Sequence, residues 1–253
     1  MPSFYTDHYV NQTVMQFFSK SLELPLLNIN DYKDNDEIFI TYGILRGTGE
    51  IIKKKKENFI YIDHGFYRSS TRKFTKEKKT ILNELGGYFR VIKGDLYFNN
   101  FEFELDSKRF DELDIELKDK RKGDIIILSE PSQNTLDFLE IKNWSEDTID
   151  EIKKYSDREI VVHNKFSEVP LKSLLEKAFA FVSCQSTAGF QAIAEGVPAY
   201  FTHESLKKFG NIVDIEKNQL NYDVLYAAAN SQWQLKEFFS DEFKLYIDKI
   251  ISK

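Results

Sequence analysis

The apolar positions in the second half of the chain follow a strand, helix, strand order. Short apolar runs of the length of buried strands recur at intervals: residues 124–128, 159–162 and 178–182, and again from Val197. Between the last two, Phe190, Ile193 and Ala194 fall on one face of a helix that Gly196 ends. Runs that are apolar on both faces are typical of parallel strands covered by helices. The pattern predicts a parallel α/β domain.

The first half shows the same order more weakly. The elements it predicts are strands over residues 37–42, 59–62 and 87–93, and helices over residues 9–19 and 50–56. The charged segment 118–123, which a glycine closes, is interpreted as an interdomain linker. The sequence therefore predicts two domains, residues 1–121 and 122–253. It leaves open whether the C-terminal helix packs back on the first domain.

A turn of small polar residues joins the strand over residues 178–182 to the next helix. Unpaired backbone amides and the positive end of a helix dipole attract phosphate at such a junction. The candidate ligands for a diphosphate are Ser183, Gln185, Ser186 and Thr187. An ordinary strand, helix, strand unit in which Ser183 or Ser186 merely caps the helix explains the same residues.

The pattern Ser-Thr-Ala-x-x-x-Ala-x-x-x-Gly-x-Pro at residues 186–198 resembles the nucleotide-sugar donor motif of GT-B glycosyltransferases, especially capsule-polysaccharide-like and phage-encoded ones. The resemblance implies an α/β fold with two Rossmann-like domains facing across a cleft. It also implies that the second domain binds a nucleotide-diphosphate sugar, most simply a UDP-sugar, without an obligatory metal. Gln191 stands where the family usually carries glutamate, and a neutral amide would hold the ribose hydroxyls more weakly.

Other segments extend the resemblance. Related enzymes often show Arg-x-Lys after the second strand of this domain, where the chain keeps Lys165 but has His163 in place of the arginine. Ser129 follows the preceding strand, at the edge where open α/β sheets bind ligands. The tail over residues 226–237, which is expected to be helical, resembles a family element, Ala-x-x-Gln-Trp-x-Leu-x-Glu. Either Gln232 and Trp233 face the cleft, or Trp233 locks the last helix onto the core.

Candidate chemistry in the first half follows two strands. Arg46 lies between glycines at residues 43–47, which permits close approach of a ligand and bidentate contact with phosphate. Asp63 and His64 end the next strand, where either can take a proton from an acceptor hydroxyl. Both segments resemble the N-terminal half of phage-type GT-B enzymes. The alternatives are a solvated loop around Arg46, and a capping Asp63 beside a structural His64.

Composition narrows the class of protein. The chain has 253 residues, of which 42% are hydrophobic, and a net charge of −6, as expected of a globular protein. No apolar run is long enough to span a bilayer, and the N-terminus lacks the features of a signal peptide. The single cysteine, Cys184, cannot form an internal disulfide and is disfavoured as a nucleophile. We therefore expect a cytoplasmic protein.

The charge is distributed unevenly. Residues 46–79 carry eleven Lys and Arg against four Asp and Glu, a balance of +7, whereas residues 124–253 carry fourteen against twenty-one, a balance of −7. A basic stretch attracts a polyanionic acceptor. The acceptor expected on this ground is a 5-hydroxymethylated pyrimidine in phage DNA, flipped out of the duplex to expose its hydroxyl. A phage-encoded enzyme of this kind would act in the host cytoplasm.

Two other functions fit the sequence. One is a transferase that acts on capsule or surface glycans. The other is a catalytically silent protein that binds nucleotide-sugars or nucleic acid, for which His163 and Gln191 are the motivating departures from the family. The Asp-Asn-Asp segment at residues 34–36 matches a metal-binding pattern of another glycosyltransferase class, but it precedes a strand instead of ending one, so no metal site is assigned.

Overall fold

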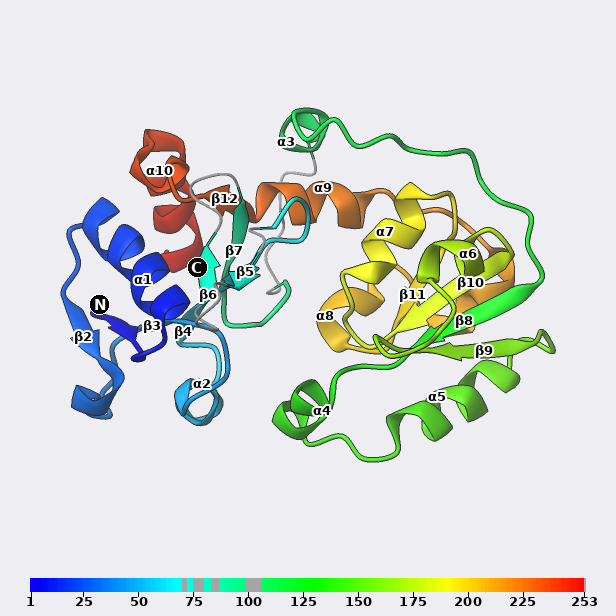
Figure 1. Ribbon diagram of the computed structural model, residues 1–253, viewed down its shortest axis with the longest axis horizontal. Helices are drawn as coiled ribbons and strands as arrows, with labels where there is room; N and C mark the ends of the chain where they lie inside the picture. The colour runs from blue at the N-terminus through cyan, green and yellow to red at the C-terminus, as the bar shows by residue number, and fades with distance from the viewer. Residues whose placement is uncertain (70–71, 75–79, 83–86, 99–105, 253) are drawn as a thin grey trace. The chain divides into compact units, whose positions relative to one another are not determined.

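The computed structural model describes residues 1–69, 72–74, 80–82, 87–98 and 106–252. It divides into two compact units, Met1–Phe103 with Ala228–Lys253 and Glu104–Ala227. Each unit has its own mainly parallel sheet with helices packed on it, so the chain has the α/β class that the sequence predicts (Figure 1). The chain enters the second unit and returns to the first, whereas the sequence predicted one boundary after residue 121.

The first unit is built on a six-stranded sheet in the order β12-β7-β4-β3-β1-β2. Its strands are β1 (Ser3–Tyr5), β2 (Leu26–Asn28), β3 (Phe39–Tyr42), β4 (Phe59–His64), β7 (Tyr88–Lys93) and β12 (Gln232–Gln234). The first four pair in parallel, and β7 and β12 extend the sheet through antiparallel ladders. A separate hairpin pairs β5 (Arg72–Phe74) with β6 (Thr80–Leu82). Because β1 lies between β2 and β3, the carboxyl ends of β1 and β3 form a topological switch point.

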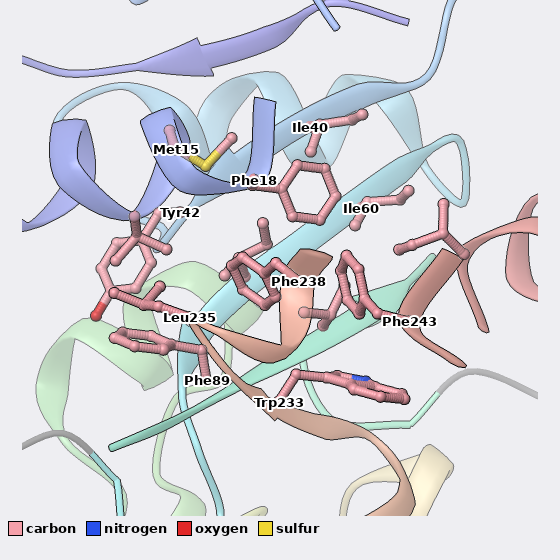
Figure 2. Packing of buried hydrophobic residues seen from close by; sticks show 14 of the residues in the cluster. Met15, Phe18, Ile40, Tyr42, Ile60, Phe89, Trp233, Leu235, Phe238 and Phe243 are labelled. Atoms are coloured by element: carbon pink, nitrogen blue, oxygen red, sulfur yellow. The ribbon is translucent and has the colours of Figure 1, made fainter. Parts of the chain in front are cut away.

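An aromatic core covers one face of this sheet beneath α1 (Tyr9–Ser21) and α10 (Asp241–Ile251). Figure 2 shows Phe18 above Phe238 and Phe243, whose ring centroids lie 5.7 and 5.8 Å from that of Phe18. Trp233 packs on Phe243 at 5.2 Å and is 4% exposed, so it belongs to the core. Full burial of one such side chain contributes about 1.5–3 kcal/mol, which holds the C-terminal helix on the first unit. This unit also contains α2 (Thr48–Lys55), η1 (Ile29–Asp31) and η3 (Glu237–Phe239).

The tail over residues 226–237 is not one helix. Helix α9 (Asp223–Asn230) ends before Gln232, and the next residues form β12, with Trp233 opposite Phe89 of β7. The edge of β7 offers backbone amides and carbonyls that need partners, and an added strand supplies them. This ladder is the physical reason that the predicted helical tail is interrupted.

The second unit contains a four-stranded parallel sheet in the order β11-β10-β8-β9. Its strands are β8 (Ile125–Ser129), β9 (Ile160–His163), β10 (Ala178–Ser183) and β11 (Ala199–Phe201). The other elements are α3 (Lys108–Asp111), α4 (Gln133–Leu139), α5 (Trp144–Lys153), α6 (Leu171–Leu175), α7 (Ala188–Ala194), α8 (Glu204–Lys207) and η2 (Ile212–Lys217). Helix α5 lies on one side of the sheet and α7 on the other (Figure 1).

The segment assigned to an interdomain linker lies within the second unit. Lys118 N donates to Ala194 O and Arg121 N donates to Gly196 O, both at 2.8 Å. The side chains of Lys118 and Arg121 donate to the Glu195 carboxylate at 2.7 and 2.9 Å. The hydrogen bond from Lys118, with that from Arg121, lowers the pKa of Glu195 although burial opposes the shift. These contacts tie the approach to β8 to the end of α7.

The docking of this segment gives a stability prediction. Gly196 has φ +82°, and a Cβ there would lie 2.1 Å from Asp119 O. We expect Gly196→Ala to lower the free energy of unfolding by about 2–4 kcal/mol, because left-handed strain adds to a clash with backbone. Gly47→Ala is the control, since Gly47 has φ +89° but nothing within 4 Å of a Cβ, and strain alone costs about 1–2 kcal/mol.

Urea unfolding followed by tryptophan fluorescence measures both losses. Trp144 reports on the second unit and Trp233 on the first. A Gly196→Ala protein as stable as Gly47→Ala would contradict the close packing of residues 118–123 on the end of α7.

Candidate functional site

Three of the candidate residues lie at one edge of the second sheet. Ser183 of β10 is the register partner of Ser129 of β8, and Ser129 is the partner of His163 of β9. Strand β8 lies between β9 and β10. The chain therefore runs from β8 to β9 on one side, and then crosses back to form β10 on the other side of β8. The carboxyl ends of β8 and β10 therefore form the topological switch point, where open α/β sheets bind ligands. Ser129 and Ser183 both belong to this position.

The serine turn after β10 is closed by its own side chains. Ser186 N donates to Ser183 Oγ at 3.3 Å, and Ala188 N donates to Ser186 Oγ at 3.2 Å. Two of the backbone amides expected to cradle a diphosphate are thus already bonded. This is the capping arrangement that the sequence offered as the alternative. Phosphate contact at this turn would have to come mainly from side chains.

The candidates of the turn differ in exposure. Thr187 and Gln191 are exposed, Ser186 is half-buried and Ser183 is fully buried. Gln185 is 5% exposed, and its side-chain oxygen has no hydrogen-bond partner among the described residues. A buried amide oxygen in this state is costly unless a ligand or water satisfies it. Gln185 therefore joins Thr187 as a group with bonding capacity left for a ligand.

Cys184 points away from the turn into the core. Strand alternation places it with Val182 on the face covered by α5, where Trp144 Nε1 donates to Thr202 Oγ1 at 2.9 Å. Burial raises the pKa of the Cys184 thiol, although a hydrogen bond with Thr202 opposes the shift. A buried thiol with a raised pKa is a poor nucleophile.

His163 and Lys165 flank the end of β9. The His163 carbonyl accepts from Glu130 N at 2.9 Å, which joins the loops after β8 and β9. Lys165 is exposed, and its ammonium lies 4.8 Å from the ring centroid of Phe166. Lys165 therefore places an exposed cation at the ligand-binding edge of the second sheet.

In the first unit, the half-buried Asp63 is ion-paired with the buried Arg90. Its Oδ2 accepts from Tyr61 OH at 2.5 Å and from Arg90 Nη2 at 3.0 Å, and its Oδ1 accepts from His64 N at 2.8 Å. Burial would raise the pKa of Asp63, but the charge of Arg90 and the hydrogen bonds outweigh it and lower the pKa. A carboxylate in this state has little tendency to accept a proton.

His64 lies on the opposite face of the same strand. Its ring stacks on Phe89 at a centroid distance of 6.4 Å and meets Tyr42 edge-on at 6.0 Å, on the side of the aromatic core. Successive side chains of a strand point to opposite faces, so adjacency in sequence separates Asp63 from His64. The two candidate bases cannot act on one proton.

Sequence reasoning missed Arg90 as part of this site, and it offered Gln232 only as a residue that faces the cleft. Arg90 is opposite Asp63 in the β4–β7 register and opposite Gln232 in the β12–β7 register. Its guanidinium lies 4.5 Å from the Tyr97 ring centroid and 5.3 Å from that of Tyr61. Gln232 is fully buried and accepts from Tyr67 N at 2.9 Å, which fixes the loop after β4. No periodicity pairs residues so distant in sequence.

Arg46 occupies the loop that leaves the switch point of the first sheet. It is exposed and has φ +63°, between Gly43 at +72° and Gly47 at +89°. The hydroxyl of Thr48 closes the loop by donating to Gly43 O and Leu45 O, each at 2.8 Å. A residue other than glycine in the left-handed region is strained, and such strain concentrates at ligand-binding loops.

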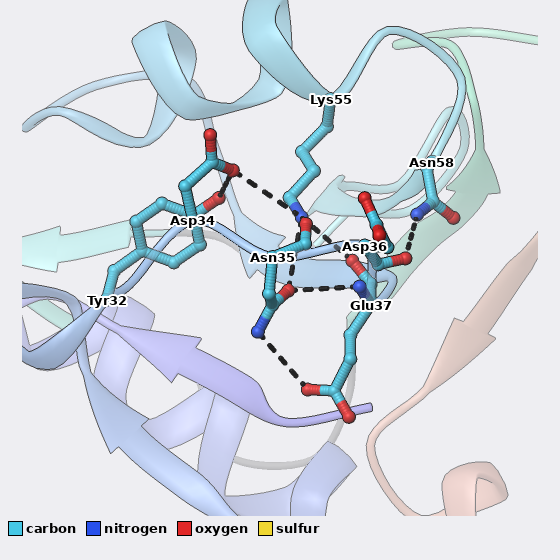
Figure 3. A network of polar contacts seen from close by, with 7 residues as sticks. All are labelled: Tyr32, Asp34, Asn35, Asp36, Glu37, Lys55 and Asn58. Carbon is cyan, nitrogen blue, oxygen red and sulfur yellow. Dashed lines mark hydrogen bonds and ion pairs between the residues drawn. The ribbon is translucent and has the colours of Figure 1, made fainter.

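The segment over residues 34–36 forms a polar network around Lys55 (Figure 3). Asp34 accepts from Tyr32 OH at 2.8 Å and pairs with Lys55 Nζ at 3.9 Å, and Lys55 also donates to Glu37 O at 3.0 Å. Burial and the Asp34 carboxylate raise the pKa of Tyr32 to about 12. The Lys55 ammonium thus lies at the centre of this network.

The described residues contain no group of three or more His, Cys, Asp or Glu placed to hold a metal ion. No described helix combines the length and the apolar character that crossing a bilayer requires.

Comparison with known proteins supports the fold. No family model matches the chain, and no curated protein matches it. Among solved structures, it is similar to Thermosulfurimonas dismutans KpsC, a beta Kdo 2,7 transferase, at 11% identity and a TM-score of 0.50. The match covers 97% of this chain and 100% of the other. At this identity the likeness shows the fold alone, an α/β fold with parallel sheets, and nothing of the activity or the substrate.

The ion pair gives a prediction on stability and pH. We expect Asp63→Asn to lower the free energy of unfolding by about 3 kcal/mol at pH 7, because it leaves Arg90 buried without its carboxylate. Since folding lowers the pKa of Asp63, the advantage of the native protein is present above the ordinary aspartate pKa of about 4. This stability advantage is lost as the pH falls through the lowered pKa of Asp63 in the folded protein.

Chemical denaturation at several pH values measures this effect. Asp36→Asn is the control, because Asp36 is exposed in the same unit. A loss for Asp63→Asn that matches the control at pH 7, or that does not shrink in acid, would contradict the ion pair.

The buried thiol gives a second prediction. We expect Cys184 to resist a thiol reagent in the native protein and to react fully in denaturant, because it is 1% exposed and its pKa is raised. The absorbance of the thiolate that the reagent releases measures the rate at which Cys184 is modified. A Cys184→Ala, Thr187→Cys protein, with its thiol moved to the exposed residue of the turn, should react in the native state. Rapid native labelling of Cys184 would show that the turn opens.

Proposed function

We propose that this protein is a glycosyltransferase that takes a sugar from a nucleotide-sugar donor, most simply a UDP-sugar, in a GT-B arrangement. The observation that carries the proposal is the switch point of the second sheet. There Ser129 and Ser183 lie side by side, next to the turn that bears the donor-like motif. The likeness in fold to a Kdo transferase supports the same class.

In this proposal the donor contacts the polar side chains of the turn. Thr187 and Ser186 hydroxyls bind the diphosphate, and the Lys165 ammonium and the exposed Gln191 add polar contacts to the donor. The buried oxygen of Gln185 accepts a donor hydroxyl or an ordered water. As the diphosphate departs, hydrogen bonds from these side chains and a positive charge of the protein stabilise the negative charge that develops on it. A bound metal is not required for this role.

For the acceptor, the geometry favours His64 over Asp63 as the proton acceptor. Asp63 is ion-paired with Arg90 and has a lowered pKa, so it accepts a proton poorly, whereas His64 lies on the opposite face of the strand and takes no part in that ion pair. Asp63 then acts as a structural anion that holds the strand end. Arg46, exposed at the neighbouring strand end, supplies a positive charge for an anionic substrate.

The acceptor itself has two candidates. The basic stretch over residues 46–79 is the ground for hydroxymethylated DNA, but Lys55 is buried and bonded to backbone oxygens, and residues 70–71 and 75–79 lie outside the described residues. The likeness to a protein described as a Kdo transferase favours a surface glycan. We propose the glycan as the first acceptor to test and phage DNA as the second.

Donor turnover tests the proposal. Purified protein is incubated with a panel of UDP-sugars and with either a capsule-type oligosaccharide or a hydroxymethylated DNA oligonucleotide, and UDP release and acceptor mass are measured. We expect acceptor-dependent release. Thr187→Val should lower kcat/KM for the donor about 10- to 100-fold, because it removes a hydroxyl from the diphosphate site. Ser173→Ala, on exposed α6, is the control and should have no effect.

The outcomes separate the functions. Mass increase of the oligosaccharide alone would remove the DNA function, and increase of the oligonucleotide alone would remove the glycan function. Donor binding without turnover on either acceptor would identify a non-catalytic binding protein. The absence of both donor binding and turnover would overturn the proposal.

A further inference from the structure

Phe166 has a surface position that packing does not explain. Its side chain is 82% exposed, more than that of any other large apolar residue that the structure describes. It lies in the loop directly after β9, at the ligand-binding edge of the second sheet. Aromatic rings exposed at such an edge offer a flat apolar face to a ligand.

The loop that carries Phe166 is held by hydrogen bonds. Asn164 Nδ2 donates to Glu130 Oε2 at 2.9 Å, and Glu130 Oε1 accepts from Ser145 Oγ at 2.8 Å. Phe166 N donates to Asn164 Oδ1, and Asn164 N donates to Ser167 Oγ, both at 2.9 Å. The ring is therefore presented by a braced turn, and a ligand that stacks on it has little ordering cost to meet.

The position of the loop suits one part of a nucleotide. Adjacent strands are about 4.8 Å apart, so the end of β9 lies about 10 Å across the sheet from the turn after β10. That span matches a nucleoside diphosphate whose phosphates lie at the turn and whose base lies beside β9. The Lys165 ammonium, 4.8 Å from the ring centroid, covers one side of Phe166 and leaves the other for a base.

We propose that Phe166 is the stacking platform for the nucleobase of the donor, so that the loop after β9 is the nucleoside half of the donor site. The inference rests on the proposed function, because it assigns a place to the base of the nucleotide-sugar. Stacking accepts any base, so the platform contributes affinity for nucleotides and leaves the choice of base to other groups.

Calorimetric titration of the full chain tests the platform. The probes are UDP, CDP, GDP and ADP, with inorganic pyrophosphate as the ligand that lacks a base. Stacking on an aromatic side chain contributes about 1–3 kcal/mol, so Phe166→Ala should weaken the tightest nucleotide about 5- to 150-fold and leave pyrophosphate unchanged. Val213→Ala, which truncates another exposed apolar residue of the same unit, should change neither.

A second variant reports on contact directly. Phe166→Trp should keep nucleotide affinity, and its new fluorescence should be quenched by the nucleotide but not by pyrophosphate. Unchanged nucleotide affinity in Phe166→Ala, or an equal loss for pyrophosphate, would overturn the platform while leaving the transferase proposal intact. If the unaltered protein binds pyrophosphate no less tightly than every nucleotide, the platform is overturned. If it binds none of the probes, the proposed function fails with it.

Discussion

The pairing of β8 with β10 is the constraint on which the candidate donor site depends. The intervening β9 pairs on the far side of β8, so the connection from β9 to β10 must cross the sheet. As a result, the connections after β8 and β10 run in opposite directions from two adjacent strand ends, and Ser129 lies next to Ser183. Residues 54 positions apart in the sequence thus share one edge, because parallel strands connected by helices end on the same side.

The turn at this edge is stable without a ligand. Serine hydroxyls bond two of its amides, and the segment over residues 118–123 ties down the far end of α7 through Glu195. A preformed turn lowers the ordering cost of binding, while the exposed Thr187 and the buried oxygen of Gln185 keep capacity for a ligand. The site has therefore the character of a fixed polar frame, to which an aromatic platform at Phe166 adds an apolar contact.

The first unit shows how strand geometry divides neighbouring residues between roles. Asp63 and His64 are adjacent, yet one enters an ion pair with Arg90 and the other stacks on Phe89 across the sheet. The carboxylate neutralises a guanidinium that is itself buried among aromatic rings, so removal of the carboxylate would leave a buried charge unpaired and is expensive. The ion pair between Asp63 and Arg90 fixes the end of β4, while the His64 imidazole lies on the opposite face and takes no part in that pair.

The sequence by itself determined the α/β class, the four strands of the second unit, the serine turn and the helix after it, because these depend on local periodicity and turn chemistry. It also indicated that Lys165 lies near the ligand edge. Only the tertiary structure decided that β12 completes the first sheet, that residues 118–123 dock on α7, that Asp63 pairs with Arg90, and that Phe166 stays exposed. Short strands such as β1 and β12, three residues each, carry no periodic signal, and an ion pair between β4 and β7 depends on a register that no local pattern encodes.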